Sequence, residues 1–149
     1  MSEQWGSDRY TGPGKQTEHG WRAGFWRRVS AYFIDGLVVG AVGGVAELEL
    51  KGVGDVIAVL FSLGYFVYCW AGRRGQTLGM AMVGIRVIDS TDGEELGYEA
   101  AVLRWFGQAL CGLSLGLGFL WMLWDSNSQT WADKIGGSVV VPVWAYPDS

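Results

Sequence analysis

Arg28 and Asp35 are the residues whose types and positions most clearly imply chemistry, because they stand at the start of a long apolar stretch. Asp35 is the only charged residue between Val29 and Ala46. A charged side chain at membrane depth costs about 2.5–3.5 kcal/mol even on a lenient insertion scale, so it must be paired or functional. Asp35 is therefore a candidate site for an ion or a proton, or a member of a structural ion pair.

Helix geometry separates these two residues. They are seven positions apart and share a helix face, at a distance of roughly 10.5 Å along the axis at ~1.5 Å per residue. Side chains tilt toward the helix N-terminus, so Arg28 points away from Asp35 and toward the membrane interface. The sequence therefore predicts that each finds its partner on another segment.

The cations that can reach Asp35 come from outside the two long apolar segments. They are Arg73, Arg74, Arg86, Arg104 and Lys134. Arg104, at the start of a third apolar segment, is the predicted partner of Asp35. Asp133 is the predicted counter-charge of Arg28 if the C-terminal segment folds back beneath the spans.

Composition indicates a membrane protein. Half of the 149 residues are hydrophobic, nine are Trp and 24 are Gly, which suits closely packed helices in lipid better than a soluble domain. No Cys/His cluster has metal-ligand spacing, and no Gly-rich loop ends in Lys-Ser or Lys-Thr. We expect no enzyme activity, no cofactor or metal, and no nucleic-acid partner. Cys69 and Cys111 lie in apolar segments and are expected to be buried thiols.

Two apolar segments are long enough to span a bilayer. The first, residues 29–46, would be roughly 27 Å long as a helix at ~1.5 Å per residue, and the aromatic residues before it extend it. The second covers residues 56–71. Arginine pairs precede the first and follow the second, so the positive-inside rule places both ends in the cytoplasm. We expect a multi-pass protein of the inner or plasma membrane, surrounded by the lipid bilayer, with a cytoplasmic N-terminus.

Glycines recur at helix-packing intervals in the apolar regions. Gly36, Gly40 and Gly44 are four residues apart, a spacing of small residues that favours close helix contact. Gly112 and Gly116 repeat the interval further along the chain. These glycines are predicted to pack helices, and a transport role would require association with a second copy or a membrane partner protein.

The third apolar segment, residues 105–124, is interrupted by glycines and either crosses once or re-enters on one side. A short internal sequence repeat, called the echo below, favours re-entry. Gln76-Thr77 and Gln129-Thr130 are each followed at the same spacing by Gly and then Val. Each copy follows an apolar segment, so both copies are predicted to lie at the same membrane face.

The predicted fold is an all-α membrane protein with two full transmembrane helices, a third Gly-broken apolar segment and a small cytoplasmic β element. Paired strands at 85–88 and 138–143 would form that element. Residues 1–24 are predicted to be a disordered polar tail, residues 25–141 the membrane domain, and residues 142–149 a short C-terminal tail.

Three blocks of this sequence resemble the RDD family of membrane proteins. They are Arg28 with Ala31, Ile34 and Asp35; Gly75-Gln76-Thr77-Leu78-Gly79 leading to Gly84-Ile85-Arg86-Val87-Ile88-Asp89; and Asp125 with Gln129-Thr130 and Asp133-Lys134-Ile135-Gly136-Gly137 ahead of Val139-Val140-Val141. Each block alone would be weak, but the three in order are specific.

The resemblance implies an integral membrane protein whose name-giving Arg and two Asp correspond to Arg28, Asp35 and Asp133. It also implies suspected transport of unidentified ligands, with cation–proton antiport proposed for some members. Many members have His before the last Asp, where this chain has Ala132, so a relay through that His is absent here. Two functions stay open: transport of an ion or small solute with Asp35 as the intramembrane site, or a non-transporting scaffold or accessory subunit with a structural polar clasp.

Overall fold

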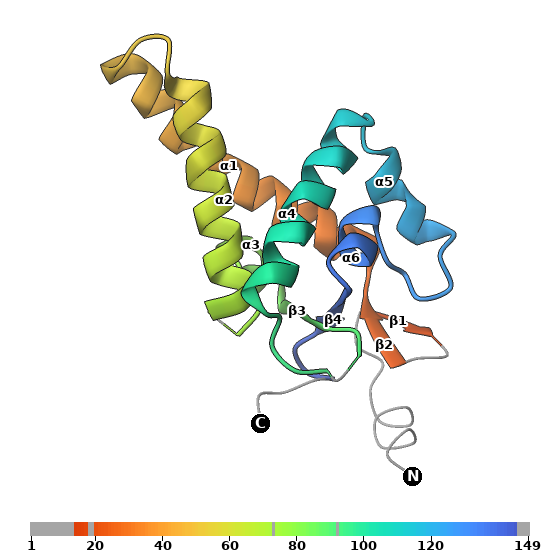
Figure 1. Cartoon of the computed structure of the whole chain (residues 1–149). Coiled ribbons are helices and arrows are strands. Elements are labelled where there is room, and N and C mark those ends of the chain that lie inside the picture. Colours follow the sequence, from red (N-terminus) through yellow and green to blue (C-terminus); the bar gives the residue numbers. More distant parts are fainter. Residues whose placement is uncertain (1–13, 18–19, 73, 92, 146–149) are drawn as a thin grey trace.

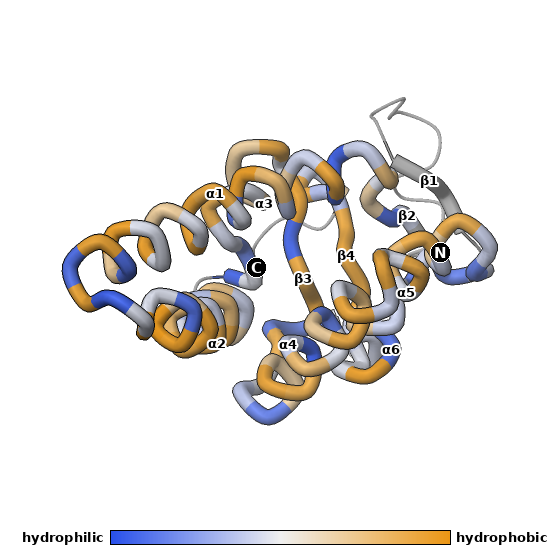
Figure 2. Tube along the Cα trace, turned by 90° about the horizontal axis from the view of Figure 1, so that it is seen from above, coloured by the Kyte–Doolittle hydropathy of each residue, from blue (hydrophilic) through white to orange (hydrophobic). Residues whose placement is uncertain are grey.

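A long helical hairpin forms one side of the molecule. The computed structural model describes residues 14–17, 20–72, 74–91 and 93–145. Helices α1 (Phe25–Glu49) and α2 (Gly54–Gly72) lie side by side (Figure 1), and each is long and apolar enough to cross a membrane. Less than a quarter of each apolar stretch is buried, and Figure 2 shows apolar residues along both helices. Such a surface requires lipid around it, so the two predicted spans are confirmed as helices.

The side chain of Glu47 stabilises the turn between the two long helices by accepting hydrogen bonds. The carboxylate oxygens of Glu47 accept hydrogen bonds from the backbone nitrogens of Gly52 and Gly54, both at 2.9 Å. An added Cβ at Gly54 would lie 2.6 Å from the Cβ of Glu47, so only Gly allows the chain to pass this close. The connection between the two spans is therefore an ordered turn.

The glycines that pack α1 against α2 are not the predicted ones. An added Cβ at Gly43 would lie 2.8 Å from the Cβ of Ala58, whereas at Gly36, Gly40 or Gly44 it would meet nothing within 4 Å. Successive helix residues are rotated by roughly 100°, so Gly43 and Gly44 face different directions. Within this chain the predicted packing role of that face is wrong, and its contact with another molecule stays a prediction.

The third apolar segment folds back on itself. Helix α4 (Tyr98–Leu113) is followed by α5 (Leu117–Leu120) and a 3-10 turn, η2 (Trp121–Leu123). The two parts are bent by 110°, and Figure 1 shows α5 descending beside α4. The bend uses left-handed backbone at Leu115 (φ 58°) and Gly116 (φ 84°), a conformation that Gly adopts without strain.

The tip of this bend is apolar and exposed. Leu113 and Leu115 are 83% and 93% exposed, respectively. An added Cβ at Gly112 or Gly116 would meet nothing within 4 Å. The prediction that these two glycines pack helices within the chain is therefore wrong. Gly116 instead serves the turn, and both glycines leave open space beside the bend.

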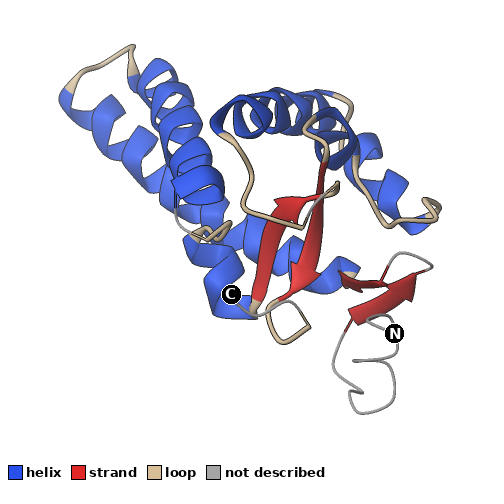
Figure 3. Ribbon diagram, turned by 60° about the horizontal axis from the view of Figure 1, so that its bottom comes forward, coloured by secondary structure: helices blue, strands red, loops and turns tan. Residues whose placement is uncertain are grey.

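A two-stranded sheet joins the distant parts of the chain. Strands β3 (Ile85–Asp89) and β4 (Ser138–Pro142) pair antiparallel (Figure 3). Ile85 lies opposite Pro142. The predicted pairing of the two strands is confirmed. Side chains on both faces of the sheet are buried, which explains why β4 contains three consecutive Val residues, 139–141, and does not alternate.

The internal echo corresponds to a repeated capped helix. Helix α3 (Leu78–Val83) precedes β3, and α6 (Trp131–Ile135) precedes β4. The hydroxyl of Thr77 caps α3, and that of Thr130 caps α6, by accepting a hydrogen bond from a backbone nitrogen in the first turn.

The glutamines of the echo have equivalent contacts. Gln76 Nε2 donates to the carbonyl oxygen of Ile85 at 3.0 Å, and Gln129 Nε2 donates to that of Ser138 at 2.9 Å. Each acceptor is the first residue of the strand that follows. The repeated spacing therefore encodes one structural unit used twice: cap, short helix, turn and strand.

The hydrophobic core lies where the α1–α2 hairpin meets the sheet. It includes Phe66 and Trp70 of α2, Met80 of α3, Val87 of β3 and Val140 of β4. Because these side chains come from distant segments of the chain, this core connects the β3–β4 sheet to the helices that pack against it.

The N-terminal region is ordered earlier than predicted. Strands β1 (Gly14–Thr17) and β2 (Gly20–Ala23) pair antiparallel, and β2 contacts β4. Ala23 is fully buried in the core, and Arg22 donates to Asn127 Oδ1 at 2.7 and 3.0 Å. Residues 14–17 and 20–24 of the predicted tail are therefore ordered, whereas residues 1–13, 18 and 19 of that tail lie outside the described residues.

The C-terminal prediction is shifted by one residue. Strand β4 includes Pro142, which is buried, and a turn follows it to Ala145. The rest of the predicted tail, residues 146–149, lies outside the described residues.

Candidate functional site

Asp133 is the centre of a buried ion-pair cluster. It lies in the first turn of α6, where its Oδ2 accepts a hydrogen bond from the backbone nitrogen of Thr130 at 3.0 Å. The same oxygen accepts from Arg28 Nη1 at 2.5 Å, and Oδ1 accepts from Arg104 Nη1. The three charged side chains are at most 1% exposed. The predicted pairing of Asp133 with Arg28 is confirmed by this contact.

The two arginines connect Asp133 to the rest of the fold. Arg28 Nη2 donates to the carbonyl oxygen of Ser128 at 3.0 Å, and Arg104 Nη1 donates to Ser138 Oγ at 2.8 Å. The Arg104 Cζ atom also lies 4.8 Å from the centre of the Trp70 ring. Two guanidinium groups against one carboxylate leave an excess positive charge, which the face of Trp70 partly stabilises. This one cluster thus holds α1, α2, α4, α6 and β4 together.

The charge state of Asp133 follows from its neighbours. Burial by itself raises the pKa of Asp133, because it penalises the ionised form. The charges of Arg104 and Arg28 and their hydrogen bonds outweigh burial and hold the pKa at about 2. Asp133 is therefore ionised at neutral pH and is poorly suited to carrying a proton.

Asp35 has a different set of partners, all of them neutral. Its Oδ1 accepts from the Tyr65 hydroxyl at 2.9 Å and from the backbone nitrogen of Gly79 at 3.0 Å. Its Oδ2 accepts from Thr77 Oγ1 at 2.5 Å. Asp35 is 1% exposed. The predicted partnership with Arg104 is wrong, because Arg104 is bound to Asp133.

Close packing of α3 on α1 explains this outcome. An added Cβ at Gly79 would lie 2.2 Å from the carbonyl oxygen of Ala31, so α3 lies directly against α1. The start of α3 then occupies the space beside Asp35, and its backbone supplies a donor. The Tyr65 hydroxyl also accepts from the backbone nitrogen of Leu78 at 3.0 Å, which joins α2 to the same point.

The other predicted polar residues lie apart from these clusters. Lys134 Nζ contacts Asp125 Oδ1 at 2.6 Å, and Lys134 is 45% exposed. Burial raises the pKa of Asp125, but the hydrogen bonds from Lys134 and from the backbone of Gln129 lower it below its usual value. Of the remaining candidate cations, Arg74 follows α2 and Arg86 lies in β3, whereas Arg73 is outside the described residues.

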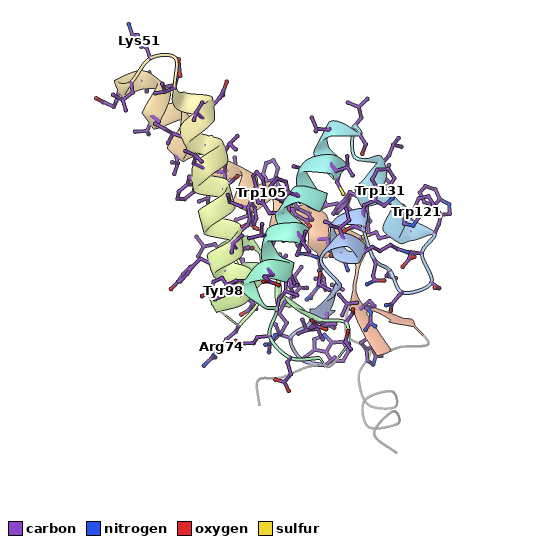
Figure 4. The ribbon with its side chains drawn as sticks, viewed as in Figure 1. Lys51, Arg74, Tyr98, Trp105, Trp121 and Trp131 are labelled. Atoms are coloured by element: carbon purple, nitrogen blue, oxygen red, sulfur yellow. The ribbon has the colours of Figure 1, made fainter. Side chains whose placement is uncertain are left out.

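Two cavities border the clusters. The larger, of about 450 Å³, lies between α1, α4, α5 and α6. The smaller, of about 360 Å³, lies at the end of α2 and is lined by Arg74 and by Thr77, whose hydroxyl donates to Asp35. Figure 4 shows Arg74 and Tyr98 at this end of α2 and α4. Among the residues that the structure describes, no group of His, Cys, Asp or Glu could hold a metal ion.

Sequence reasoning missed most of the neutral partners. Thr77, Tyr65 and Gly79 surround Asp35, and Ser138 and Trp70 complete the arginine cluster. The echo pointed to Thr77 as a repeated position, and its role as a helix cap could have been inferred from it. A backbone nitrogen or an aromatic face leaves no comparable signal.

Comparisons with known proteins place this geometry in a family. The sequence model described as RDD family matches residues 22–137. The chain is 31% identical over 97 residues to the "Proline-rich antigen homolog" of Mycobacterium tuberculosis, covering 61% of this chain and 40% of that protein. It is 33% identical over 89 residues to the "Proline-rich antigen" of Mycobacterium leprae, covering 58% of this chain and 36% of that protein.

A relative from another genus matches over more of its length. It is the "Uncharacterized protein YxaI" of Bacillus subtilis, 25% identical over 126 residues, with 66% of this chain and 83% of that protein covered. The aligned part spans about two fifths of the length of the mycobacterial relatives. No solved structure matches the chain.

Proposed function

The chain belongs to the RDD family of membrane proteins, and from that premise we propose that it is a non-transporting scaffold or accessory module of the membrane. In this proposal Arg28, Asp35, Arg104 and Asp133 form a structural polar clasp. The observation that carries it is that both carboxylates are at most 1% exposed and that all four of their oxygens already accept hydrogen bonds. A solute would have to displace these donors before it could bind.

The clasp has a defined mechanical role in this proposal. Asp133 and its arginines fix α6 and the bent α4–α5 pair to α1, and Asp35 fixes α3 to α1 and α2. Helix α3, which binds Asp35, leads into β3, and helix α6, which carries Asp133, leads into β4 of the same sheet. Because a buried ion pair is costly to break, by about 3–5 kcal/mol, the clasp gives the two helical hairpins one fixed arrangement.

The proposed topology places the sheet and the N-terminus in the cytoplasm and lets the α4–α5 pair re-enter the membrane. Pairing of β3 with β4 supports this, since these strands flank the bent pair and bring its two ends to one side. The exposed apolar tip at Leu113 and Leu115 is suited to insertion into lipid. A reporter fused after Ser149 that reads as extracytoplasmic would contradict the proposal.

The test of the scaffold proposal is Asp35→Asn combined with a flux assay. We expect no flux of Na⁺, K⁺, Li⁺ or protons through the wild-type protein in proteoliposomes. The variant should have lower yield and thermal stability, because Asn cannot accept all three hydrogen bonds. Flux through the wild type that the variant abolishes, while remaining folded, would contradict the scaffold proposal.

Transport is the second candidate, and one observation favours it. The smaller cavity is lined by Thr77, whose hydroxyl donates to Asp35 Oδ2 at 2.5 Å. A proton or a small cation could therefore reach the carboxylate by a movement of one side chain. In that case Thr77→Ser should retain flux and Asp35→Asn should remove it.

A partner is part of both proposals. The face formed by Gly36, Gly40 and Gly44 is open within this chain and would allow a second copy or another membrane protein to approach closely. Cross-linking between cysteines introduced at these positions tests it, with Gly43, which is already packed on α2, as the control position.

A further inference from the structure

The smaller cavity, at the end of α2, combines a positive charge with a position at the end of a membrane span. Its volume of about 360 Å³ falls within the range of small-molecule sites, roughly 300–1,000 Å³. Of the described residues that line it, only Arg74 is charged. We propose that this cavity binds the phosphate group of an anionic phospholipid, with Arg74 as the binding residue. This inference goes beyond the scaffold proposal and does not depend on it.

The position of the cavity favours a lipid as the source of that phosphate. Helix α2 is long and apolar enough to cross a membrane and ends at Gly72, and Arg74 follows two residues later. Phospholipid headgroups lie at the depth where a span ends, and cationic side chains placed there attract anionic lipids. Leu78 also lines the cavity and is 45% exposed, so it can contact the apolar part of a lipid whose phosphate is bound to Arg74.

The backbone at Arg74 supports a role for its side chain. Arg74 has a φ of 56°, a left-handed conformation that strains a residue with a Cβ and that Gly adopts freely. The neighbouring Gly75 fixes the course of the chain, because an added Cβ there would lie 2.0 Å from the carbonyl oxygen of Val87. Backbone strain of this kind is concentrated at functional sites. The presence of Arg at a position that suits Gly therefore points to a use for the guanidinium group.

Two negative groups near the cavity determine which end of it an anion can occupy. The C-terminus of α2 carries roughly half a negative elementary charge, and Asp35 accepts a hydrogen bond from Thr77 in the cavity lining. Arg74 is exposed and carries a full positive charge, and its planar fork can donate two parallel hydrogen bonds to one phosphate. Because Coulomb energy falls with distance, direct contact with Arg74 outweighs the more distant negative groups. The phosphate is therefore expected at the Arg74 end.

Tyr98 offers a neutral donor at the same end. Gly72 lines the cavity, and a Cβ added to it would lie 3.3 Å from the Tyr98 hydroxyl oxygen. Figure 4 shows Tyr98 and Arg74 together at this end of the molecule. Tyr98 is 61% exposed, as is usual for Tyr side chains in the headgroup region. Its hydroxyl can donate to a headgroup oxygen of a lipid held by Arg74.

The experiment is native mass spectrometry of the full chain in detergent micelles, with palmitoyl-oleoyl phosphatidylglycerol as the anionic probe. Palmitoyl-oleoyl phosphatidylcholine has the same acyl chains but no net charge. We expect one molecule of phosphatidylglycerol to bind about fivefold more tightly than phosphatidylcholine, as one interfacial Arg provides. Equal binding of the two lipids would overturn the proposal.

Glycerol 3-phosphate separates a lipid from a soluble phosphate compound as the ligand. It carries a phosphate and a glycerol but no acyl chain, so a tenfold excess should leave bound phosphatidylglycerol in place. Displacement of the lipid by glycerol 3-phosphate would show that the site takes a soluble phosphate compound, and would overturn the assignment to a phospholipid.

Variants assign the binding to Arg74. Arg74→Gly should remain folded, because Gly adopts the left-handed backbone without strain, yet it should lose the preference for phosphatidylglycerol. Arg74→Gln should lose it as well. The matched change Lys51→Gln removes one positive charge at the opposite end of the α1–α2 hairpin (Figure 4) and should retain the preference. A folded Arg74→Gly protein that keeps the preference, or an equal loss in Lys51→Gln, would overturn the proposal.

Discussion

Asp35 and Asp133 are both buried carboxylates, yet their surroundings differ in charge. Asp133 is held by two guanidinium groups, whereas Asp35 is held by two hydroxyls and a backbone amide. Loss of the charge on Asp133 leaves two buried cations without a counter-ion. Loss of the charge on Asp35 leaves only hydrogen-bond donors to be satisfied.

The difference in partner charge suits the two aspartates to different roles. The Asp133 cluster depends on charge, so it is suited to a permanent connection between α1, α4 and α6. The Asp35 cluster depends on hydrogen bonds, so it tolerates a neutral carboxyl better. If any residue of the motif exchanges a proton or cation, Asp35 is the one that can do so without leaving buried charges unbalanced.

The largest effect is expected for Asp133→Asn. It removes the counter-charge of Arg28 and Arg104, both fully buried, and should lower the free energy of unfolding by about 3–5 kcal/mol. Thermal unfolding of the purified protein in detergent measures it. Asp35→Asn is the matched control and should cost less, about 1–3 kcal/mol. Equal losses in the two variants would show that charge does not distinguish the two clusters.

A smaller effect is expected for Gly79→Ala. The added Cβ would lie 2.2 Å from the carbonyl oxygen of Ala31, so α3 must move away and weaken the bond from Gly79 to Asp35. Overpacking of this kind costs typically about 1–3 kcal/mol. Gly36→Ala, one residue from Asp35 but with open space around it, should be neutral or slightly stabilising by the same thermal measurement. A Gly79→Ala protein as stable as the wild type would contradict the close contact.

The spans, the strand pair and the Arg28–Asp133 contact could be predicted from the sequence. Hydropathy predicts the spans, and the repeated Gln-Thr spacing predicts that two equivalent strand-like stretches lie at the same membrane face. Helix geometry turned Arg28 toward the interface and away from Asp35, and Asp133 was its predicted counter-charge on the condition that the C-terminal segment folds back beneath the spans. In each case the signal is carried by residue type at a fixed spacing.

The partners of Asp35 and the packing glycines could not be predicted in this way. Gly79 contributes a backbone nitrogen and the absence of a side chain, and neither distinguishes it from the other 23 glycines in the sequence. Gly43 packs on Ala58 because of how α2 is placed, while the more regular glycine spacing faces away. The early strands were missed because their order depends on contact with β4, far along the chain.

Acid provides a smaller test of the same comparison. The pKa of Asp133 is lowered to about 2 from 3.8, so its contribution to stability is complete above about pH 5 and is lost as the pH falls toward 2. Between pH 7 and pH 3 the loss from this group is about 1 kcal/mol. Thermal unfolding at pH 7, 5 and 3 should therefore show a steeper decline in the wild type than in Asp133→Asn. Parallel declines would indicate that Asp133 is not held by its arginines.

The smallest effect is expected at the third aspartate, Asp125. Its partner Lys134 is 45% exposed, so solvent screens the pair and exposed pairs of this kind contribute about 0–1 kcal/mol. Lys134→Ala should change thermal stability by no more than that, and the change should shrink further in high salt. Asp125 also accepts from the backbone nitrogens of Asn127 and Gln129, so Asp125→Asn should cost more than Lys134→Ala. A salt-independent loss in Lys134→Ala as large as that in Asp133→Asn would mean that exposure, which separates this pair from the Asp133 cluster, does not set the strength of ion pairs in this protein.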